Sequence, residues 1–441
     1  MNRSVLRRLA TALLLCSPVI GCSSWLGDNA PPPLPGKRIS VLTHSRSLEP
    51  SSTAEPDIIL PAPEAVADWP QAGGYPPHAM HHLALGDSPR RVWSTSVGEG
   101  GSRRRVFLTQ PIVADGVVFA MDARSRVSAI TLDKGDRLWR QDLAPKDSGD
   151  GTYGGGLAYD SGTLFVTSGF GQIVALDAKT GKEMWRRPLP APVRGAPTVR
   201  GGRILLITVD NQTLALSTED GRDLWTHSGL SEMAAMVGGT SPAVDGNTVI
   251  SAYTSGEVFA LRIENGTTVW SDVLAGIKRT DQVGTMTDIR GLPVVFDGRV
   301  FAAGNSDLVA AIDLRSGRRV WQRDVGSIHT PWIAGDYLYL LTNTPELVGF
   351  EAATGKILWV TPLQKWEDEE DRTGRIVWTG PVLASDRLIV ASSEGVALTV
   401  SPYNGAFLGR LDLPDGVSIP PIVASNTLIF LTDNGDLIAY R

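Results

Sequence analysis

Short apolar runs separated by turn residues make up most of this chain. Around residue 200, for example, a Gly201-Gly202 turn leads into the apolar run 204–209, and a second turn at Asp210-Asn211 leads into the run 213–216. Runs of this length, bounded by Gly, Asn and Asp and without a helical period, predict strands joined by tight turns. The pattern indicates an all-β protein.

A phrase of the form Asp/Glu-x-x-Thr/Ser-Gly, followed by a Trp, repeats along the chain. It is clearest at 175–185, 311–321 and 351–359. The Gly permits a hairpin turn, and the Trp then lies on the next strand, where it can bury roughly 150 to 250 Å² between neighbouring units. Successive unit-ending tryptophans are 38 to 51 residues apart, close to the roughly 40 to 45 residues of a propeller blade. The tryptophans that we expect to dock neighbouring blades are Trp93, Trp139, Trp185, Trp225, Trp270, Trp321 and Trp359.

The last two units are incomplete copies of this repeat. Unit 379–409 ends without a Trp, and unit 420–441 stops before its fourth strand. Pairing of the strand around Trp93 with the C-terminal unit would supply that strand and hide both open sheet edges. We therefore predict an eight-bladed β-propeller of four-stranded antiparallel blades, closed by an N-terminal strand, as the domain formed by residues 69–441.

The N-terminus is typical of an export signal. Three arginines precede the apolar run 9–20, which is too short to span a bilayer as a mature helix and predicts a signal peptide over 1–21. The run stops at Val19-Ile20-Gly21-Cys22, which resembles a bacterial lipobox, so we expect lipid attachment at Cys22. An ordinary secretory leader with an incidental Cys22 is the alternative.

Lipidation would hold the protein at a membrane. Two or more acyl chains anchor a protein stably, and Ser23 rather than Asp after the Cys is what the lipobox resemblance associates with the outer membrane. We expect an outer-membrane lipoprotein at the periplasmic face. Cys16 leaves with the leader, so Cys22 alone remains and no intramolecular disulfide can form.

Composition separates a tether from the propeller and disfavours one class of partner. Residues 22–68 hold many prolines among Ser, Ala and Glu, which favours an extended, lipidated tether. The chain has 41 Lys and Arg against 47 Asp and Glu, a formal charge of −6, and loss of the three leader arginines makes it −9. Nucleic-acid binding needs a basic face, so we expect none.

These motifs together resemble a known family. The Trp phrase resembles the tryptophan-docking motif of PQQ-like (quinoprotein) propellers, and Trp-Pro-Gln-Ala-Gly-Gly at 69–74 resembles their opening motif. With the lipobox and the tether, the chain resembles the BamB family, in its alphaproteobacterial branch. That resemblance implies a non-enzymatic scaffold without a cofactor. It would bind the POTRA domains of BamA and other subunits of the β-barrel assembly (BAM) complex, and assist delivery and insertion of unfolded outer-membrane proteins.

One segment matches a partner-contacting loop of that family in part. Segment 191–197 resembles the family pattern Leu-x-Leu-Arg-Gly-x-x-Ala-Pro. Arg194 matches the Arg, Val193 replaces one Leu, and Ala191 stands where the other Leu would be. The resemblance implies partner binding by Arg194, with Val193 beside it.

A second segment, 287–293, resembles the family's next functional loop, which carries two acids shortly before a Pro. Asp288 matches the first acid, but Arg290 replaces the second. The resemblance implies partner binding by Asp288, with Arg290 as its neighbour by position. An exposed Arg beside a small apolar patch is typical of an interface hot spot. The alternative is that Arg194 and Asp288 are surface charges or an intramolecular pair.

Enzymes share this predicted architecture. A quinoprotein dehydrogenase would hold its cofactor in the central channel over a Ca²⁺ bound by Glu, Asn and Asp oxygens. Asp281, Asp288, Asn305 and Asp307 are channel candidates, but isolated acids and amides in propeller loops are usually turn formers. The mature chain also lacks the adjacent Cys pair of the alcohol-oxidising branch. We therefore expect that the protein is not an enzyme. A third alternative is a propeller that binds envelope glycan or another envelope protein.

Two clusters remain outside these patterns. His78, His81 and His82 lie in a Pro/Gly-rich entry segment with no carboxylate or Cys nearby in the sequence, which favours surface histidines over a metal site. The acidic run 367–371 predicts a solvated loop, because five adjacent like charges repel one another. That loop could steer a basic partner or bind Ca²⁺.

Overall fold

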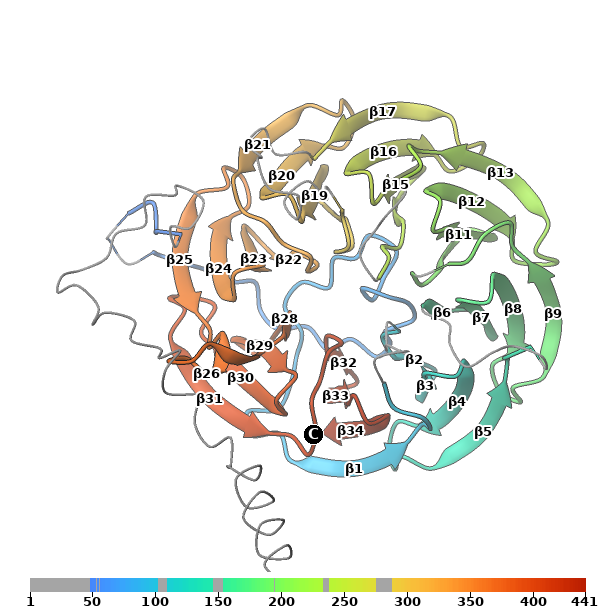
Figure 1. Ribbon diagram of the computed structural model, residues 1–441, viewed down its shortest axis with the longest axis horizontal. Helices are drawn as coiled ribbons and strands as arrows, with labels where there is room; N and C mark the ends of the chain where they lie inside the picture. Colours follow the sequence, from blue (N-terminus) through green and yellow to red (C-terminus); the bar gives the residue numbers. More distant parts are fainter. Residues whose placement is uncertain are drawn as a thin grey trace, which may run out of the picture. The chain divides into compact units, whose positions relative to one another are not determined.

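Eight sheets of four antiparallel strands follow one another around a central axis in the computed structural model (Figure 1). The structure describes residues 48–52, 54, 56–101, 109–145, 154–193, 195–232, 238–274 and 288–441. Residues 49–441 form one compact unit, which thus takes in part of the expected tether. The predicted eight-bladed propeller is confirmed. Cys22 and Arg194 lie outside the described residues, and within these no helix is long and apolar enough to cross a bilayer.

Each of the first seven blades runs in chain order from its innermost to its outermost strand. The first four blades consist of β2 (Ile112–Ala114), β3 (Val117–Met121), β4 (Arg126–Thr131) and β5 (Arg137–Asp142); β6 (Gly155–Asp160), β7 (Thr163–Ser168), β8 (Gln172–Asp177) and β9 (Glu183–Pro188); β10 (Thr198–Arg200), β11 (Arg203–Ile207), β12 (Gln212–Ser217) and β13 (Asp223–Ser228); and β14 (Ala243–Asp245), β15 (Thr248–Ala252), β16 (Glu257–Arg262) and β17 (Thr268–Val273).

The remaining blades include one that is closed by both ends of the propeller. They consist of β18 (Val294–Phe296), β19 (Arg299–Gly304), β20 (Leu308–Asp313) and β21 (Arg319–Arg323); β22 (Trp332–Ala334), β23 (Tyr337–Leu341), β24 (Glu346–Glu351) and β25 (Ile357–Pro362); β28 (Trp378–Ala384), β29 (Arg387–Ser392), β30 (Val396–Val400) and β31 (Phe407–Asp412); and β32 (Ile422–Ala424), β33 (Thr427–Leu431) and β34 (Asp436–Tyr440) with β1 (Arg91–Ser96). A small hairpin of β26 (Trp366–Asp368) and β27 (Thr373–Arg375) precedes the seventh blade.

The N-terminal strand β1 completes the eighth blade. It pairs antiparallel with β34, so that Ser94 lies opposite Ile438, and the blue and red strands lie side by side in Figure 1. The predicted closure is therefore confirmed. Beyond β34, the Arg441 side chain donates to Thr427 Oγ1 at 2.9 Å and to the Leu132 carbonyl of the first blade at 3.2 Å. These bonds fix the chain end across the closure.

Each unit-ending Trp docks its blade onto the next one. The Trp225 indole Nε1, for example, donates to the Ile263 carbonyl at 2.8 Å. Its ring lies over Gly266, where an added Cβ would come within 2.5 Å of it, and Gly266 has a φ of +71°, which favours glycine. All seven tryptophans named in the sequence analysis make the equivalent indole-to-carbonyl bond.

The seventh blade lacks a docking Trp for a topological reason. Docking uses the turn between the third and fourth strands of the next blade. In the eighth blade those strands are β34 and β1, the two ends of the propeller, so no turn joins them. Gly409 on β31 takes the Trp position because no such turn follows it.

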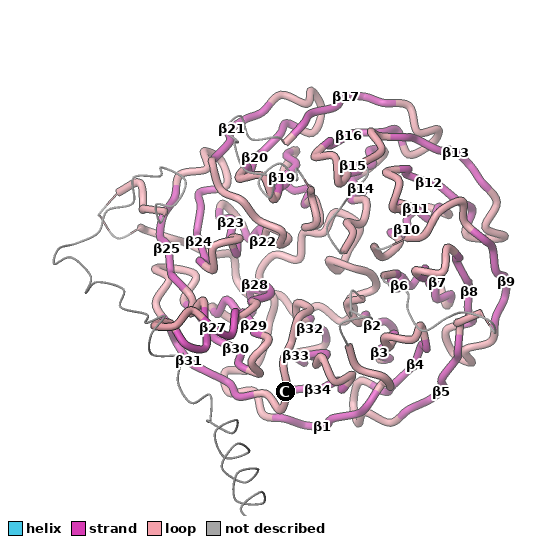
Figure 2. Tube along the Cα trace, in the orientation of Figure 1, coloured by secondary structure: helices cyan, strands magenta, loops and turns pink. Residues whose placement is uncertain are grey.

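Residues 64–85, which we call the belt, run once around the axis and hydrogen-bond to every blade. The amides of Val113, Val244 and Val295, on three innermost strands, donate to belt carbonyls at 2.7 to 2.9 Å. The belt closes on itself where Ala84 N donates to the Glu64 carbonyl at 2.8 Å. It is the blue segment across the centre of Figure 1 and is drawn mainly as loop in Figure 2. Because innermost strands have a free inner edge, the belt satisfies backbone groups that would otherwise be unpaired.

Two of the three belt histidines are buried, so the prediction of surface histidines was wrong for His78 and His82. Nδ1 of His82 donates to the Pro61 carbonyl at 2.7 Å, and Nδ1 of His78 donates to the Pro293 carbonyl at 2.8 Å. Burial lowers the pKa of His78 to about 4. These rings fasten the belt, and no group of three His, Cys, Asp or Glu suited to a metal occurs within the described residues.

Candidate partner-binding surface

The loops that join each outermost strand to the next innermost strand form the candidate surface. Three consecutive ones matter here: the loop between β9 and β10 (189–197), the loop between β13 and β14 (229–242), and the described end, 288–293, of the loop between β17 and β18. They include both segments that resemble family contact loops.

The three loops contact one another in series. At Gly195, an added Cβ would come within 2.3 Å of the Thr240 carbonyl oxygen. Thr240 Oγ1 in turn donates to the Gly291 carbonyl at 3.4 Å, and an added Cβ at Gly291 would come within 2.3 Å of the His329 carbonyl oxygen. Such close approaches to backbone leave room for glycine alone, so the two glycines fix how the loops stack.

Arg194 and Arg290 occupy equivalent positions in the sequences of their loops. The first loop ends in Arg-Gly-Ala-Pro and the third in Arg-Gly-Leu-Pro, each directly before the innermost strand of its blade. Arg194 itself lies outside the described residues, although both its neighbours are placed. Arg290 is therefore the sequence counterpart of Arg194 two blades further on. The sequence analysis compared Arg290 only with the second acid of its own family loop and so did not indicate this equivalence.

Val193 and Asp288 are both buried, and partner binding at these positions stays a prediction. Val193 is 0% exposed, packs in the core between the second and third blades, and forms a β-bridge with Thr208. Asp288 is 3% exposed, and its carbonyl accepts from Asn305 N at 2.9 Å. Both residues therefore hold their loops in place.

Arg290 is partly buried among other charged or titratable groups. Burial lowers its pKa, while the nearby Asp288 raises it. Burial and Asp288 also raise the pKa of Glu232, and burial and Arg290 lower the pKa of His329 to about 3. Arg290 and Asp288 thus act on each other within the molecule. The guanidinium stays charged and can donate to a carboxylate or a backbone carbonyl of a partner.

Leu230 is an exposed apolar residue in this surface that the sequence reasoning missed. It is 66% exposed, yet its backbone is fixed: its N donates to Glu257 Oε2 and its carbonyl accepts from Asn211 Nδ2, both at 2.7 Å. Asn211 lies in the turn between β11 and β12. This turn also holds the first loop, because Val209 N donates to the Pro192 carbonyl at 2.9 Å. Leu230 stands between Gly229 and Ser231 in a loop that holds other apolar residues as well, so nothing in the sequence indicates that this side chain is exposed.

The described channel candidates for a quinone cofactor and its Ca²⁺ take part in contacts within the protein or lie in turns. Asp288 is buried beside Arg290, and Asn305 Oδ1 accepts a hydrogen bond from Asn343 Nδ2 at 3.0 Å. Asp307 occupies the turn between β19 and β20 with a φ of +57°, as expected of a turn former. Asp281 lies outside the described residues.

An eight-bladed propeller with Trp-docked blades defines the class of PQQ-like propellers. Within that class a specific family is shown. The family model for outer membrane protein assembly factor BamB matches residues 123–361 and 346–441. The chain belongs to the BamB family.

Individual relatives agree with this assignment. The chain is 28% identical over 359 residues to outer membrane protein assembly factor BamB of Yersinia pestis, covering 80% of this chain and 89% of that protein. It is 27% identical over 353 residues to BamB of Escherichia coli K12, covering 79% and 88%. An uncharacterized protein of Rickettsia conorii is 29% identical over 268 residues, covering 60% and 64%. The alphaproteobacterial branch stays a prediction.

Solved structures show the fold. BamB from Moraxella catarrhalis superposes with a TM-score of 0.69 at 20% identity, covering 80% of this chain and all of that one. A europium-containing methanol dehydrogenase superposes with a TM-score of 0.64 at 15% identity, covering 84% and 89%. The same architecture thus occurs in a BamB protein and in a dehydrogenase, so fold alone does not decide function.

Proposed function

We propose that this protein is a lipid-anchored scaffold subunit of the BAM complex, which binds the POTRA domains of BamA and assists delivery and insertion of outer-membrane proteins. The observation that carries the proposal is the family match, which spans nearly the whole propeller. Lipid attachment at Cys22 would keep the protein at the periplasmic face of the outer membrane, where such a complex works.

The stacked loops support the partner-binding part of the proposal. Arg194 retains the family's contact arginine, and the neighbouring Gly195 fixes its loop against Thr240. Leu230 offers the apolar contact that Ala191 does not provide, and its carbonyl is held by Asn211. Arginine is enriched in interface hot spots, and a fixed apolar side chain on the same surface adds the apolar part of such a contact.

The test is co-purification from envelope membranes in mild detergent. We expect the wild-type lipoprotein to retain BamA, and both Arg194→Glu and Leu230→Asp to lose it, because each places a carboxylate in the proposed contact. Arg262→Glu is the matched control, since this exposed arginine lies on β16 outside the three loops, and it should retain BamA.

The outcomes separate the parts of the proposal. Absence of BamA from the wild-type sample would contradict the scaffold function. Retention of BamA by both loop variants would keep the scaffold function and contradict the surface. Replacing residues 1–22 with a cleavable secretory leader that lacks a lipobox should release the protein into the soluble periplasmic fraction, whereas an unchanged membrane fraction would contradict lipid anchoring.

A further inference from the structure

The seventh blade departs from the others in two places that lie close together. The connection that enters it carries the β26–β27 hairpin, whose strands form a separate two-stranded sheet beside β31 and β30 (Figure 2). Its outermost strand, β31, has Gly409 in place of the docking Trp, and all but one of its residues are exposed. The entry hairpin and the bare outer strand border one groove.

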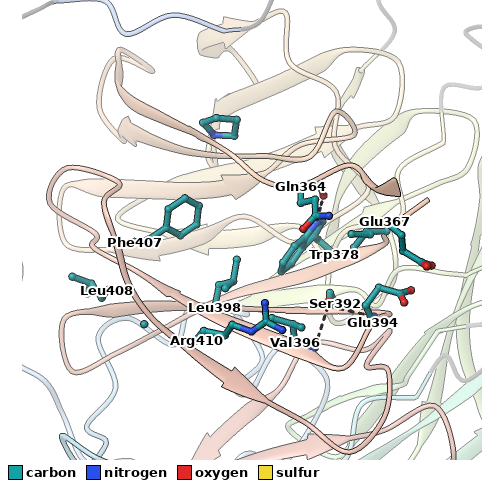
Figure 3. A pocket seen from close by; sticks show the side chains of 13 residues that line it. Gln364, Glu367, Trp378, Ser392, Glu394, Val396, Leu398, Phe407, Leu408 and Arg410 are labelled. Atoms are coloured by element: carbon teal, nitrogen blue, oxygen red, sulfur yellow. Dashed lines mark hydrogen bonds between the residues drawn. The ribbon is translucent and has the colours of Figure 1, made fainter. Parts of the chain in front are cut away.

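This groove has a volume of about 860 Å³ and is lined by the hairpin connection on one side and by β30 and β31 on the other (Figure 3). Trp378, Ile376 and Leu398 give it an apolar lining. At its outer end lie Phe407 and Leu408, which are 56% and 55% exposed. Roughly 300 to 1,000 Å³ is the usual size of a ligand pocket, so the groove is large enough for several side chains.

Groove residues also carry unneutralised negative charge. Glu367 and Glu394 line it, and neither takes part in an ion pair among the parts of the chain that the structure describes. Glu394 accepts only a weak local bond, from Ser393 Oγ at 3.1 Å. The one cation of the lining, Arg410, is paired with Asp412 at 2.8 Å. The groove therefore favours a ligand with a positive charge next to its apolar part.

Strand geometry selects the shape of that ligand. β31 pairs with β30 on one side only, so its outer edge presents backbone donors and acceptors alongside the groove. An extended peptide can pair with such an edge while its alternate side chains enter an adjacent hollow. Exposed apolar side chains on an edge strand invite aggregation unless a partner covers them.

We propose that this groove binds an extended segment of a partner protein that has alternating apolar side chains and a Lys or Arg at one end. The apolar side chains lie against Trp378, Leu398 and Leu408. The basic side chain pairs with Glu367 and Glu394. This site is on a different blade from the stacked loops and does not depend on the proposed function.

A labelled peptide tests the site with the purified propeller and no other protein. The probe is fluorescein-labelled Lys-Lys-Leu-Thr-Phe-Thr-Leu, and the matched probe has Glu-Glu in place of Lys-Lys. Fluorescence anisotropy should show saturable binding of the basic probe that weakens as salt is raised, because exposed charge pairs are screened. Leu408→Ser should weaken binding about tenfold, the effect of losing one leucine-sized apolar contact.

Two matched variants control for general effects. Met184→Ser removes a similarly exposed side chain, 59% exposed, from β9 and should leave binding unchanged. Glu394→Lys should weaken the basic probe about fivefold and favour the acidic probe, whereas Glu264→Lys in the exposed β16–β17 turn should change neither. Leu408 is exposed, so its substitution leaves the fold intact.

Three results would overturn the inference. One is no saturable binding of the basic probe to wild type. Another is equal binding by wild type and Leu408→Ser. The third is a dimer in sedimentation that Leu408→Ser dissociates and the probe does not, because the groove would then be an interface between two copies of this chain. None of these assays contains BamA or any other protein, so failure here and failure of BamA co-purification are distinguishable.

Discussion

Removing one docking tryptophan should destabilise the ring strongly, and Trp225→Ala is the most direct test. Trp225 is buried between the third and fourth blades. Its indole Nε1 donates to the Ile263 carbonyl at 2.8 Å, and its ring covers Gly266. Alanine would remove the ring, open a cavity between the blades and leave the carbonyl without its donor.

The expected loss in the free energy of unfolding is about 4 kcal/mol, since Trp→Ala in a core typically costs about 3 to 5 kcal/mol. Trp225→Phe keeps most of the ring but loses the hydrogen bond, so it should cost about 1 to 2 kcal/mol. Trp366→Ala is the matched control. Trp366 lies on the partly exposed hairpin strand β26, so its loss should cost under about 1 kcal/mol.

Urea unfolding followed by circular dichroism measures these differences. With an m-value of about 3 kcal/mol/M, Trp225→Ala should lower the urea midpoint by about 1 M. Coincident transitions by circular dichroism and tryptophan fluorescence would justify a two-state treatment. If Trp225→Ala and Trp366→Ala shifted the midpoint equally, the interpretation of the repeated Trp as the contact that holds neighbouring blades together would be refuted.

Three further predictions use the same unfolding assay. Gly221→Ala should destabilise the protein more than Gly246→Ala. Both positions have a positive φ, but only the Cβ at Gly221 would meet a docking indole, at 2.8 Å. Equal losses in the free energy of unfolding would contradict this. His78 has its pKa lowered from 6.5 to about 4 by burial, so the unfolded chain binds a proton that the folded chain does not as pH falls between these values. Stability should therefore fall over that window, and His78→Asn, which can keep the donor and the positive φ, should show a shallower fall. A disulfide between Ser96→Cys and Asp436→Cys, which are paired across the β1–β34 closure, should raise stability by about 2 to 4 kcal/mol under oxidising but not reducing conditions.

The sequence by itself determined the blades. Strands and turns are local, because the alternation of apolar and turn residues and the glycine of each Asp-x-x-Thr-Gly turn act within a few residues. The repeat then set the number of blades, and the missing fourth strand of the last unit left only the strand around Trp93 to complete it. Docking by the seven tryptophans could be predicted for the same reason, since each one repeats a single local unit.

Tertiary structure alone decided what lies around the axis. The belt sequence has no periodicity, because successive belt residues contact different blades. The burial of His78 and His82 therefore had no signal in the sequence. Burial of Val193 and Asp288 likewise depends on loops from neighbouring blades that pack on them. Only that packing distinguishes buried residues that hold a loop in place from exposed residues on the loop surface. The exposure of Leu230 and the groove beside β31 could not be predicted from the sequence either, for the opposite reason. Exposure of an apolar side chain depends on what fails to cover it, and that depends on every neighbouring element at once.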